Sequence, residues 1–202
     1  MYLYGASGHG KVIAEIAEQN NIKIEAFIDA DVNKQKILDY KILHKMPVGK
    51  DDPIIISIGN NIIRKKVVSD NPDLNYTCLI HPKTAISTRA VIAEGSVIMA
   101  GVVVNAEVQV GRHCILNTNT SLDHDCVLGD FVHISPNAAL AGNVEIGEGT
   151  HIGIGASVIQ GIKIGRWCTI GAGSVVIKDV PDGATLVGNP GKIIKMKNIH
   201  NL

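Results

Sequence analysis

The sequence predicts a small Rossmann-like α/β domain over residues 1–76, followed by a left-handed parallel β-helix over residues 77–202. Two observations lead to this prediction. An aliphatic residue recurs at every sixth position in the second part of the chain, and the chain begins with a strand, a glycine-rich turn and a helix. The composition agrees: 46% of the residues are hydrophobic but only 3% are aromatic, as expected of aliphatic layers joined by tight corners.

The α/β prediction begins with MYLYGASGHGKVIAEIAEQNN, which indicates a short apolar strand, a glycine-rich turn and a helix with Val12, Ile13, Ile16 and Ala17 at helical spacing. A second strand in KIEAFIDAD ends at Asp29, about twenty residues after the glycines, where a carboxylate can accept hydrogen bonds from a ribose. The segment IIISIGNNIIRKKVV then gives a buried strand, a turn with an N-capping asparagine, and a second helix.

The glycines of the first turn leave two interpretations open. Gly5, Gly8 and Gly10 do not follow the dinucleotide pattern G-x-G-x-x-G. A nucleotide-binding turn and a plain strand-to-helix turn that needs small residues are therefore equally supported.

The β-helix is predicted from seventeen aliphatic residues at a constant spacing of six. A second column, of mostly small residues, lies two positions before them. Each unit of six therefore has two inward residues on a short strand and three residues that turn a corner. Three such sides close an 18-residue triangular coil, and about five and a half coils fit. The aliphatic positions are Ile80, Ile86, Ile92, Ile98, Val104, Val110, Leu116, Leu122, Leu128, Ile134, Leu140, Ile146, Ile152, Val158, Ile164, Ile170 and Val176.

Glycine and cysteine both fit this coil. Glycine follows the aliphatic column at positions 111, 129, 147, 153, 165 and 171, where a corner needs either positive φ or close packing. All four cysteines fall in the small inward column. Cys78, Cys114 and Cys168 share a side but are two and three coils apart, roughly 10 and 14 Å, which exceeds the span of a disulfide. We expect buried, inert thiols that bind no zinc.

The charge balance excludes some classes of partner. Nineteen basic and nineteen acidic residues cancel, so no long-range field attracts nucleic acid or an anionic membrane. The first residues do not resemble a signal peptide, and no apolar run has the length of a membrane span. We expect a cytoplasmic protein whose partners are small molecules and copies of itself.

At this point a resemblance can be stated. The segments YGASGHG, SIGNN and IHP, the repeat containing LNTNTSLDHDCVLGDFVHIS, and the final GNPGK resemble the bacterial sugar acyltransferases of the PglD/NeuD type. This family includes bacillosamine and perosamine N-acetyltransferases and sialic acid O-acetyltransferases. The resemblance implies a homotrimer with active sites between subunits. It also implies that acetyl-CoA lies along the β-helix and that a nucleotide-sugar is held by the N-terminal domain.

The resemblance also implies roles for particular residues. His124 matches the general base and Asp125 the acidic residue that raises its basicity. The residues matched to the acetyl-CoA side are Asn117, His133, Gly142, Ile154, Ala172 and Lys192. Those matched to the nucleotide-sugar pocket are Ser7, Gly8, His9, Asp29, Gly59 and Asn60. No metal is implied. Some relatives carry adjacent acidic residues where this chain has Asp29-Ala30-Asp31, so UDP and GDP both remain open.

The coil places these residues in a way that suits acyl transfer. His124 falls on a corner and His133 points outward, so neither belongs to the core; a solvated surface histidine is the alternative. Gly142 follows His124 by 18 residues and therefore lies one coil above it, leaving room for a substrate. Transfer from a thioester needs a proton acceptor with a pKa near 7, which a histidine beside a carboxylate supplies. Asp123 flanks the same ring and is an equally open choice of carboxylate.

Several questions stay open at this stage. An amine and a hydroxyl acceptor make the same demands on His124, so N- and O-acetylation are not distinguished, nor is acetyl from a longer acyl group. A zinc lyase of the carbonic anhydrase type also uses a left-handed β-helix, but needs two histidines five apart on one strand, which this repeat lacks. A non-catalytic nucleotide-sugar-binding scaffold is a third hypothesis.

Overall fold

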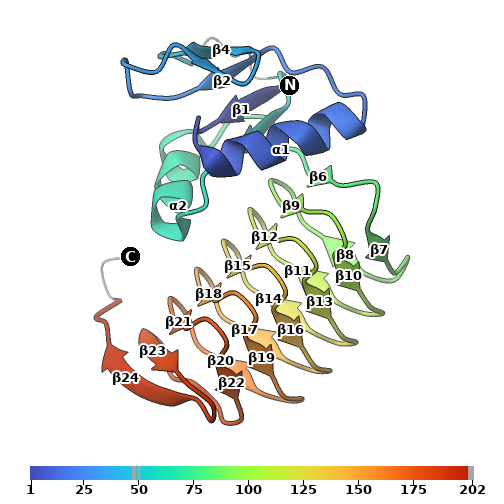
Figure 1. The fold of residues 1–202 in the computed structure, drawn as a ribbon, viewed down its shortest axis with the longest axis vertical. Helices are drawn as coiled ribbons and strands as arrows, with labels where there is room; N and C mark the ends of the chain where they lie inside the picture. The colour runs from blue at the N-terminus through green and yellow to red at the C-terminus, as the bar shows by residue number, and fades with distance from the viewer. Residues whose placement is uncertain (47–48, 50, 200–202) are drawn as a thin grey trace.

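The computed structural model describes residues 1–46, 49 and 51–199, and it contains both predicted parts (Figure 1). The first part is a five-stranded sheet in the order β3-β4-β2-β1-β5, in which β1 pairs in parallel with β2 and β5. Its elements are β1 (Tyr2–Tyr4), α1 (Gly8–Gln19), β2 (Ala26–Ile28), β3 (Lys36–Ile37), β4 (Tyr40–Leu43), β5 (Ile54–Ile56) and α2 (Asn61–Asp70). Neither of these helices is long and apolar enough to cross a membrane.

The predicted details of this domain hold with one exception. The second strand ends one residue before Asp29, and the side chain of Asn60 caps α2 by accepting the N–H of Ile63 at 3.0 Å. In α1, Ile13, Ile16 and Ala17 are buried as expected. Val12 is 40% exposed, because it lies off the face that packs on the sheet.

The second part is the left-handed parallel β-helix. Seventeen two-residue strands form three parallel sheets, and strands on one side pair with partners 18 residues away, as Leu122 pairs with Leu140. The strands are β6 (Leu79–Ile80), β7 (Ala85–Ile86), β8 (Val91–Ile92), β9 (Val97–Ile98), β10 (Val103–Val104), β11 (Gln109–Val110), β12 (Ile115–Leu116), β13 (Ser121–Leu122), β14 (Val127–Leu128), β15 (His133–Ile134), β16 (Ala139–Leu140), β17 (Glu145–Ile146), β18 (His151–Ile152), β19 (Ser157–Val158), β20 (Lys163–Ile164), β21 (Thr169–Ile170) and β22 (Val175–Val176). The hairpin of β23 (Ala184–Val187) and β24 (Lys192–Met196) follows them.

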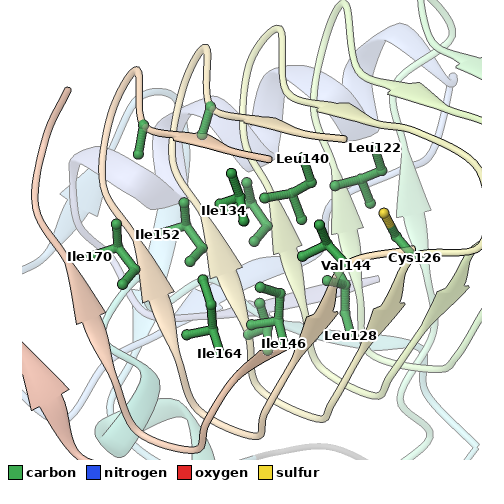
Figure 2. Close-up of a cluster of buried hydrophobic side chains, with 14 of the residues drawn as sticks. Leu122, Cys126, Leu128, Ile134, Leu140, Val144, Ile146, Ile152, Ile164 and Ile170 are labelled. Atoms are coloured by element: carbon green, nitrogen blue, oxygen red, sulfur yellow. The ribbon is translucent and has the colours of Figure 1, made fainter. Parts of the chain in front are cut away.

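The core of the β-helix consists of the two columns that the repeat predicts. Side chains such as Leu122, Ile134 and Ile152 point into the triangular interior and are fully buried, as Figure 2 shows. The smaller column, represented by Cys126 and Val144, fills the space between them. Stacked aliphatic layers of this kind remove apolar surface from water in every coil.

The corners separate the two uses of glycine that the sequence left open. Positive φ occurs one residue before each small inward residue, at every sixth position from Gly95 to Gly173, and in eight of these positions the residue is not glycine. The glycines after the aliphatic column serve close packing instead. A Cβ at Gly147, for example, would lie 2.6 Å from the backbone nitrogen of Arg166 in the next coil.

The N-terminal domain packs on one face of the β-helix. The sheet containing β6, β9 and β12 turns Leu79, Val97 and Ile115 outward, and these residues are buried together with Ile13 and Ile16 of α1. The boundary at residue 76 stays a prediction. Tyr76 forms a bridge back to Ile54 of the α/β sheet, and β6 begins at Leu79.

The four cysteines should react slowly with Ellman's reagent in the native protein. All four are free thiols, their Sγ atoms lie on backbone carbonyl oxygens, and burial raises the pKa of each, to about 12 for Cys114. Cys78 is only half-buried, contrary to the expected full burial, because it belongs to the first coil. It should therefore be modified first. Labelling followed by mass spectrometry of the peptides measures the order, and rapid native modification of Cys126 would contradict the inward column.

Candidate active site

His124 lies at an exposed corner between β13 and β14, with its ring held by Asp125. Nδ1 of the ring donates to Oδ2 of Asp125 at 2.7 Å, and Asp125 has a φ of 59°, as other residues of this corner column do. Because a carboxylate only accepts, the contact places the proton on Nδ1 and leaves the lone pair of Nε2 free. The same hydrogen bond is the main reason that the pKa of His124 is raised above its ordinary value.

Asp123, the alternative partner, makes different contacts. Its Oδ1 accepts the backbone N–H of His124 at 2.8 Å and the side-chain amide of Asn105 at 2.9 Å. Its charge adds to the raised pKa of His124 without touching the ring. Of the two carboxylates, Asp125 is the one that contacts the imidazole.

Gly142 lies directly against the ring of His124, one coil further along. A Cβ at this position would be 2.6 Å from Nε2 and 2.5 Å from Cε1 of His124. The absence of a side chain here therefore leaves the edge of the ring that carries the lone pair uncovered. The two residues are tied through their neighbours, because Asn143 donates its backbone N–H to the carbonyl of His124 at 2.8 Å.

His133 occupies a different side of the β-helix and is buried by the N-terminal domain. It points out of the coil from β15, but only 9% of the residue is exposed. Nδ1 lies 3.3 Å from the carbonyl of Gly59, which can only accept, so Nε2 is the acceptor for the side-chain amide of Asn117 at 3.2 Å. Burial is the main cause that lowers the pKa of His133 to about 3. The surface alternative is wrong here, because the second domain covers this strand.

A cavity of about 300 Å³ opens beside His133, between the start of α2 and the β-helix. The ring of His151 stacks on that of His133 at 4.8 Å between centroids, and its Nε2 lies 2.7 Å from Oγ of Ser135. Nζ of Lys197 donates to the hydroxyl of Thr169 at 3.0 Å on the same side. The residues around it are Gly59, Asn60, Asn61, Ile62, His133, Gly149, His151, Trp167, Cys168, Thr169 and Lys197. No group of three potential metal ligands occurs among the described residues.

A second cavity, of about 340 Å³, lies at the carboxyl ends of β1 and β2. Its lining includes Ser7, Asp29 and Ile63, so two of the predicted nucleotide-sugar residues meet there. Ser7 is the N-cap residue of α1, but its side chain makes no capping hydrogen bond. Asp29 is already engaged: its carboxylate accepts from the N–H of Ala6 at 2.9 Å and from Lys34 at 2.8 Å. Burial alone would raise the pKa of Asp29, but these hydrogen bonds outweigh it and the pKa is lowered.

The other predicted N-terminal residues lie close to these two cavities. Gly8 is exposed at the first position of α1, and a Cβ there would meet open space. His9 lies next to Gly59, with its ring centroid 6.1 Å from that of His133. Its Nε2 is buried without a partner, and burial lowers its pKa to about 4.

The remaining predicted residues divide between separate places. Ile154 and Ala172 lie 18 residues apart on one corner, and Asn117 lies beside the same column two coils earlier. Lys192 is exposed on β24, away from His133. His124 and Gly142 belong to another corner, and neither lines the cavity beside His133 or the one beside Asp29. In one chain the predicted site therefore exists as two separate parts.

Sequence reasoning missed three residues of this region. Arg64 is 1% exposed and hydrogen-bonded to both domains, Asn61 donates to the carbonyls of Gly149 and Thr150, and His151 stacks on His133. A signal was present for two of them. Asn61 and Arg64 are three residues apart at the start of α2, so they share a face with the buried Val67, where a charged side chain needs partners.

Comparisons with known proteins can now be added. Residues 1–70 match the model of the PglD N-terminal domain, and residues 143–178 match the bacterial transferase hexapeptide, six repeats. The acetyltransferase domain of PglB from Neisseria gonorrhoeae is 37% identical, with a TM-score of 0.89 over 96% of this chain and 98% of that one. The chain belongs to the PglD/NeuD-type family of bacterial sugar acyltransferases.

Two further members of the PglD/NeuD-type family extend this comparison. A histidine-to-asparagine mutant of perosamine N-acetyltransferase from Caulobacter crescentus was solved with CoA and GDP-perosamine; it is 34% identical, with a TM-score of 0.89 over 96% of both chains. UDP-N-acetylbacillosamine N-acetyltransferase of Bacillus subtilis is 38% identical over 112 residues, or 48% of this chain. The alignment spans 50% of the length of this curated relative.

Replacing Gly142 by alanine should abolish the function of His124 without unfolding the protein. The added methyl would displace the exposed ring, so we expect the same loss of kcat as for His124→Ala, about 10² to 10⁴. The free energy of unfolding should change by about 1 kcal/mol or less, because an exposed ring can rotate away. The double variant should be no worse than either single one. Full additivity of the two losses would show that Gly142 acts independently of His124.

The pH profile should distinguish the two aspartates. His124 must be neutral to accept a proton, so activity falls as the pH drops below its pKa. Asp125 holds that pKa above its ordinary value through the ring hydrogen bond. Asp125→Asn should therefore lower kcat and move the acidic limb of the kcat profile toward lower pH. Asp123→Asn, the matched control, should move it less. The assignment is wrong if Asp123→Asn gives the larger shift.

Proposed function

We propose that this chain is an acetyl-CoA-dependent N-acetyltransferase that acts on the amino group of a nucleotide-linked amino-deoxy sugar. The observation that carries the proposal is the corner at His124, where a histidine has one nitrogen bonded to Asp125 and the other uncovered opposite Gly142. The named relatives act on, or bind, nucleotide-linked amino sugars.

The chemistry follows from the free Nε2 of His124. The amine lone pair attacks the carbonyl carbon of the thioester, forming the C–N bond, while Nε2 accepts the amine proton. The C–S bond then breaks, and the leaving thiolate takes the proton from the imidazolium, so His124 returns to its neutral state. Asp125 keeps the ring in one tautomer and stabilises the imidazolium. No cysteine is needed as a nucleophile, because the thiols lie inside the β-helix.

The two domains have different ligands in this proposal. The cavity at Ser7 and Asp29 lies at the carboxyl ends of parallel strands, which is the usual place for a nucleotide in such sheets. The N-terminus of α1 beside it presents free N–H groups to a diphosphate. Acetyl-CoA runs along the corner of Ile154 and Ala172, toward Asn117 and His133. The gonococcal relative has been solved with acetyl-CoA and the Caulobacter relative with GDP-perosamine, which supports both ligands.

We further propose that the working form is a homotrimer. His124 and His133 lie on different sides of one triangular coil, so a second copy is needed to place them beside one substrate. The sheet that ends next to His124 turns a nearly flat row of small side chains outward, which suits packing of one copy on another. This row consists of Ala85, Val103, Ser121, Ala139, Ser157 and Val175.

A thiol-release assay tests the function. The purified protein should release CoA from acetyl-CoA only when a nucleotide-linked amino sugar is added, and the product should gain one acetyl group on nitrogen by mass spectrometry. The panel should contain UDP- and GDP-linked 4-amino-4,6-dideoxy sugars, the same nucleotides linked to sugars without an amine, and free sialic acid. UDP or GDP should compete with the sugar substrate and not with acetyl-CoA.

The outcomes separate the alternatives. Acetylation of free sialic acid in preference to every amino sugar would replace the N-acetyltransferase by an O-acetyltransferase. Tight binding of a nucleotide-sugar with no release of CoA from any partner would favour the non-catalytic scaffold. Stronger turnover with a longer acyl-CoA would keep the reaction and change the donor.

A further inference from the structure

Arg64 on α2 is a buried cation with every donor satisfied by a neutral acceptor. Nε donates to the carbonyl of His113 at 2.8 Å, and Nη2 donates to the carbonyl of Phe131 at 2.8 Å and to Oδ1 of Asn61 at 2.9 Å. Nη1 donates to the carbonyls of Ile58 at 3.0 Å and Gly59 at 3.3 Å. These five contacts use all five N–H groups of a guanidinium. Among the described residues no carboxylate forms an ion pair with Arg64.

The β-helix presents a column of carbonyls that fits this side chain. His113, Phe131 and Gly149 occupy one corner in three successive coils, each with positive φ. The ladder between coils uses the carbonyl one residue earlier, as when Phe131 donates to the carbonyl of Arg112. The corner carbonyls therefore remain available. Arg64 takes the first two and Asn61 takes the third at 3.0 Å, so α2 is set in register with three coils at once.

The same guanidinium also fixes the loop between β5 and α2. The carbonyl of Gly59 accepts from both Arg64 and His133, each at 3.3 Å. This loop separates the two cavities: Ile58 lines the one at Asp29, and Gly59 and Asn60 line the one at His133. A shift of the loop would therefore move the wall of both cavities and the partner of His133 together.

We propose that Arg64 is a positioning residue for acyl transfer, which sets the nucleotide-sugar domain in register with the β-helix through the loop at Gly59. This inference rests on the function proposed above. Arg64 contacts neither ligand cavity's contents in this account; it acts through Gly59, His133 and Asn61.

A simple anchoring role would not require this residue. The domains already share an apolar core of α1 with Leu79, Val97 and Ile115. Burying a charge without a counter-charge is unfavourable, and apolar contact would hold the domains together at lower cost. What a guanidinium adds is a rigid planar fork whose directions specify one arrangement of its acceptors. Specifying the loop position is therefore the role that distinguishes arginine from an apolar residue here.

The test compares Arg64→Met and Arg64→Lys with Arg112→Met in the full-length protein. Arg112 precedes His113 at the same corner but is exposed and pairs with Asp130, so it is the matched control. We expect kcat to fall about 10²-fold in both Arg64 variants, the cost of misplacing a reacting group by about 1 Å. The KM for the nucleotide-sugar should rise, while the KM for acetyl-CoA stays within twofold. Lysine should not rescue, because it keeps the charge but not the fork. Arg112→Met should behave as wild type.

Hydrogen exchange gives a second readout that does not depend on turnover. Amides of residues 57–63 should exchange about tenfold faster in the Arg64 variants, with the coils distant from α2 unchanged. Uniformly faster exchange, or a loss of activity explained by a smaller folded fraction with both KM values unchanged, would reduce Arg64 to a structural anchor and overturn the proposal. Should Arg64→Met fail to fold, Arg64→Lys decides. A wild-type protein without turnover contradicts the proposed function, whereas the exchange of the loop still decides the role of Arg64.

Discussion

The register of the 18-residue coil is the constraint on which the other features depend. Each coil stacks on the next through backbone hydrogen bonds between residues 18 apart, so a side chain is above or below a fixed partner. This stacking puts Gly142 against the ring of His124 and His151 on that of His133. It also aligns the corner carbonyls of His113, Phe131 and Gly149 into a column with one spacing. An inserted residue would move every later residue of its coil by one position and break all three arrangements.

How much the sequence could predict follows from this distinction between periodic and non-periodic contacts. The β-helix, the inward columns and the position of Gly142 relative to His124 follow from counting, because they are contacts between repeats. The choice of Asp125 over Asp123 could not be counted, since both flank the ring. It depends on the left-handed backbone of Asp125, which turns its carboxylate toward Nδ1. The repeat did place a corner there, but left the type of corner glycine open.

The burial of His133 and the role of Arg64 were not predictable in this way because they depend on how the two domains dock. Periodicity shows that His133 points outward, but not that α2 covers it. The outward column of that sheet holds a clue, since Leu79, Val97 and Ile115 are apolar and are followed by His133, His151 and Thr169. An apolar stretch that becomes polar indicates a covered surface next to a cavity. Arg64 lacks even that signal, because its acceptors are backbone carbonyls of another domain.

The docked arginine also separates the histidines of this chain into two electrostatic classes. Burial, with a contribution from the charge of Arg64, lowers the pKa of His9, His113, His133 and His151, to about 4, 4 and 3 for the first three. These rings stay neutral near pH 7 and supply hydrogen bonds of fixed direction. His124, exposed and bonded to a carboxylate, has a raised pKa and can exchange a proton in that range. The unfolded chain takes up protons on the buried histidines below about pH 6.5, whereas the folded chain resists until about pH 4. Stability therefore falls with pH across that window as a consequence of the docking that keeps the buried rings neutral. Proton transfer and substrate positioning are thus assigned to different histidines by whether α2 and its arginine cover them.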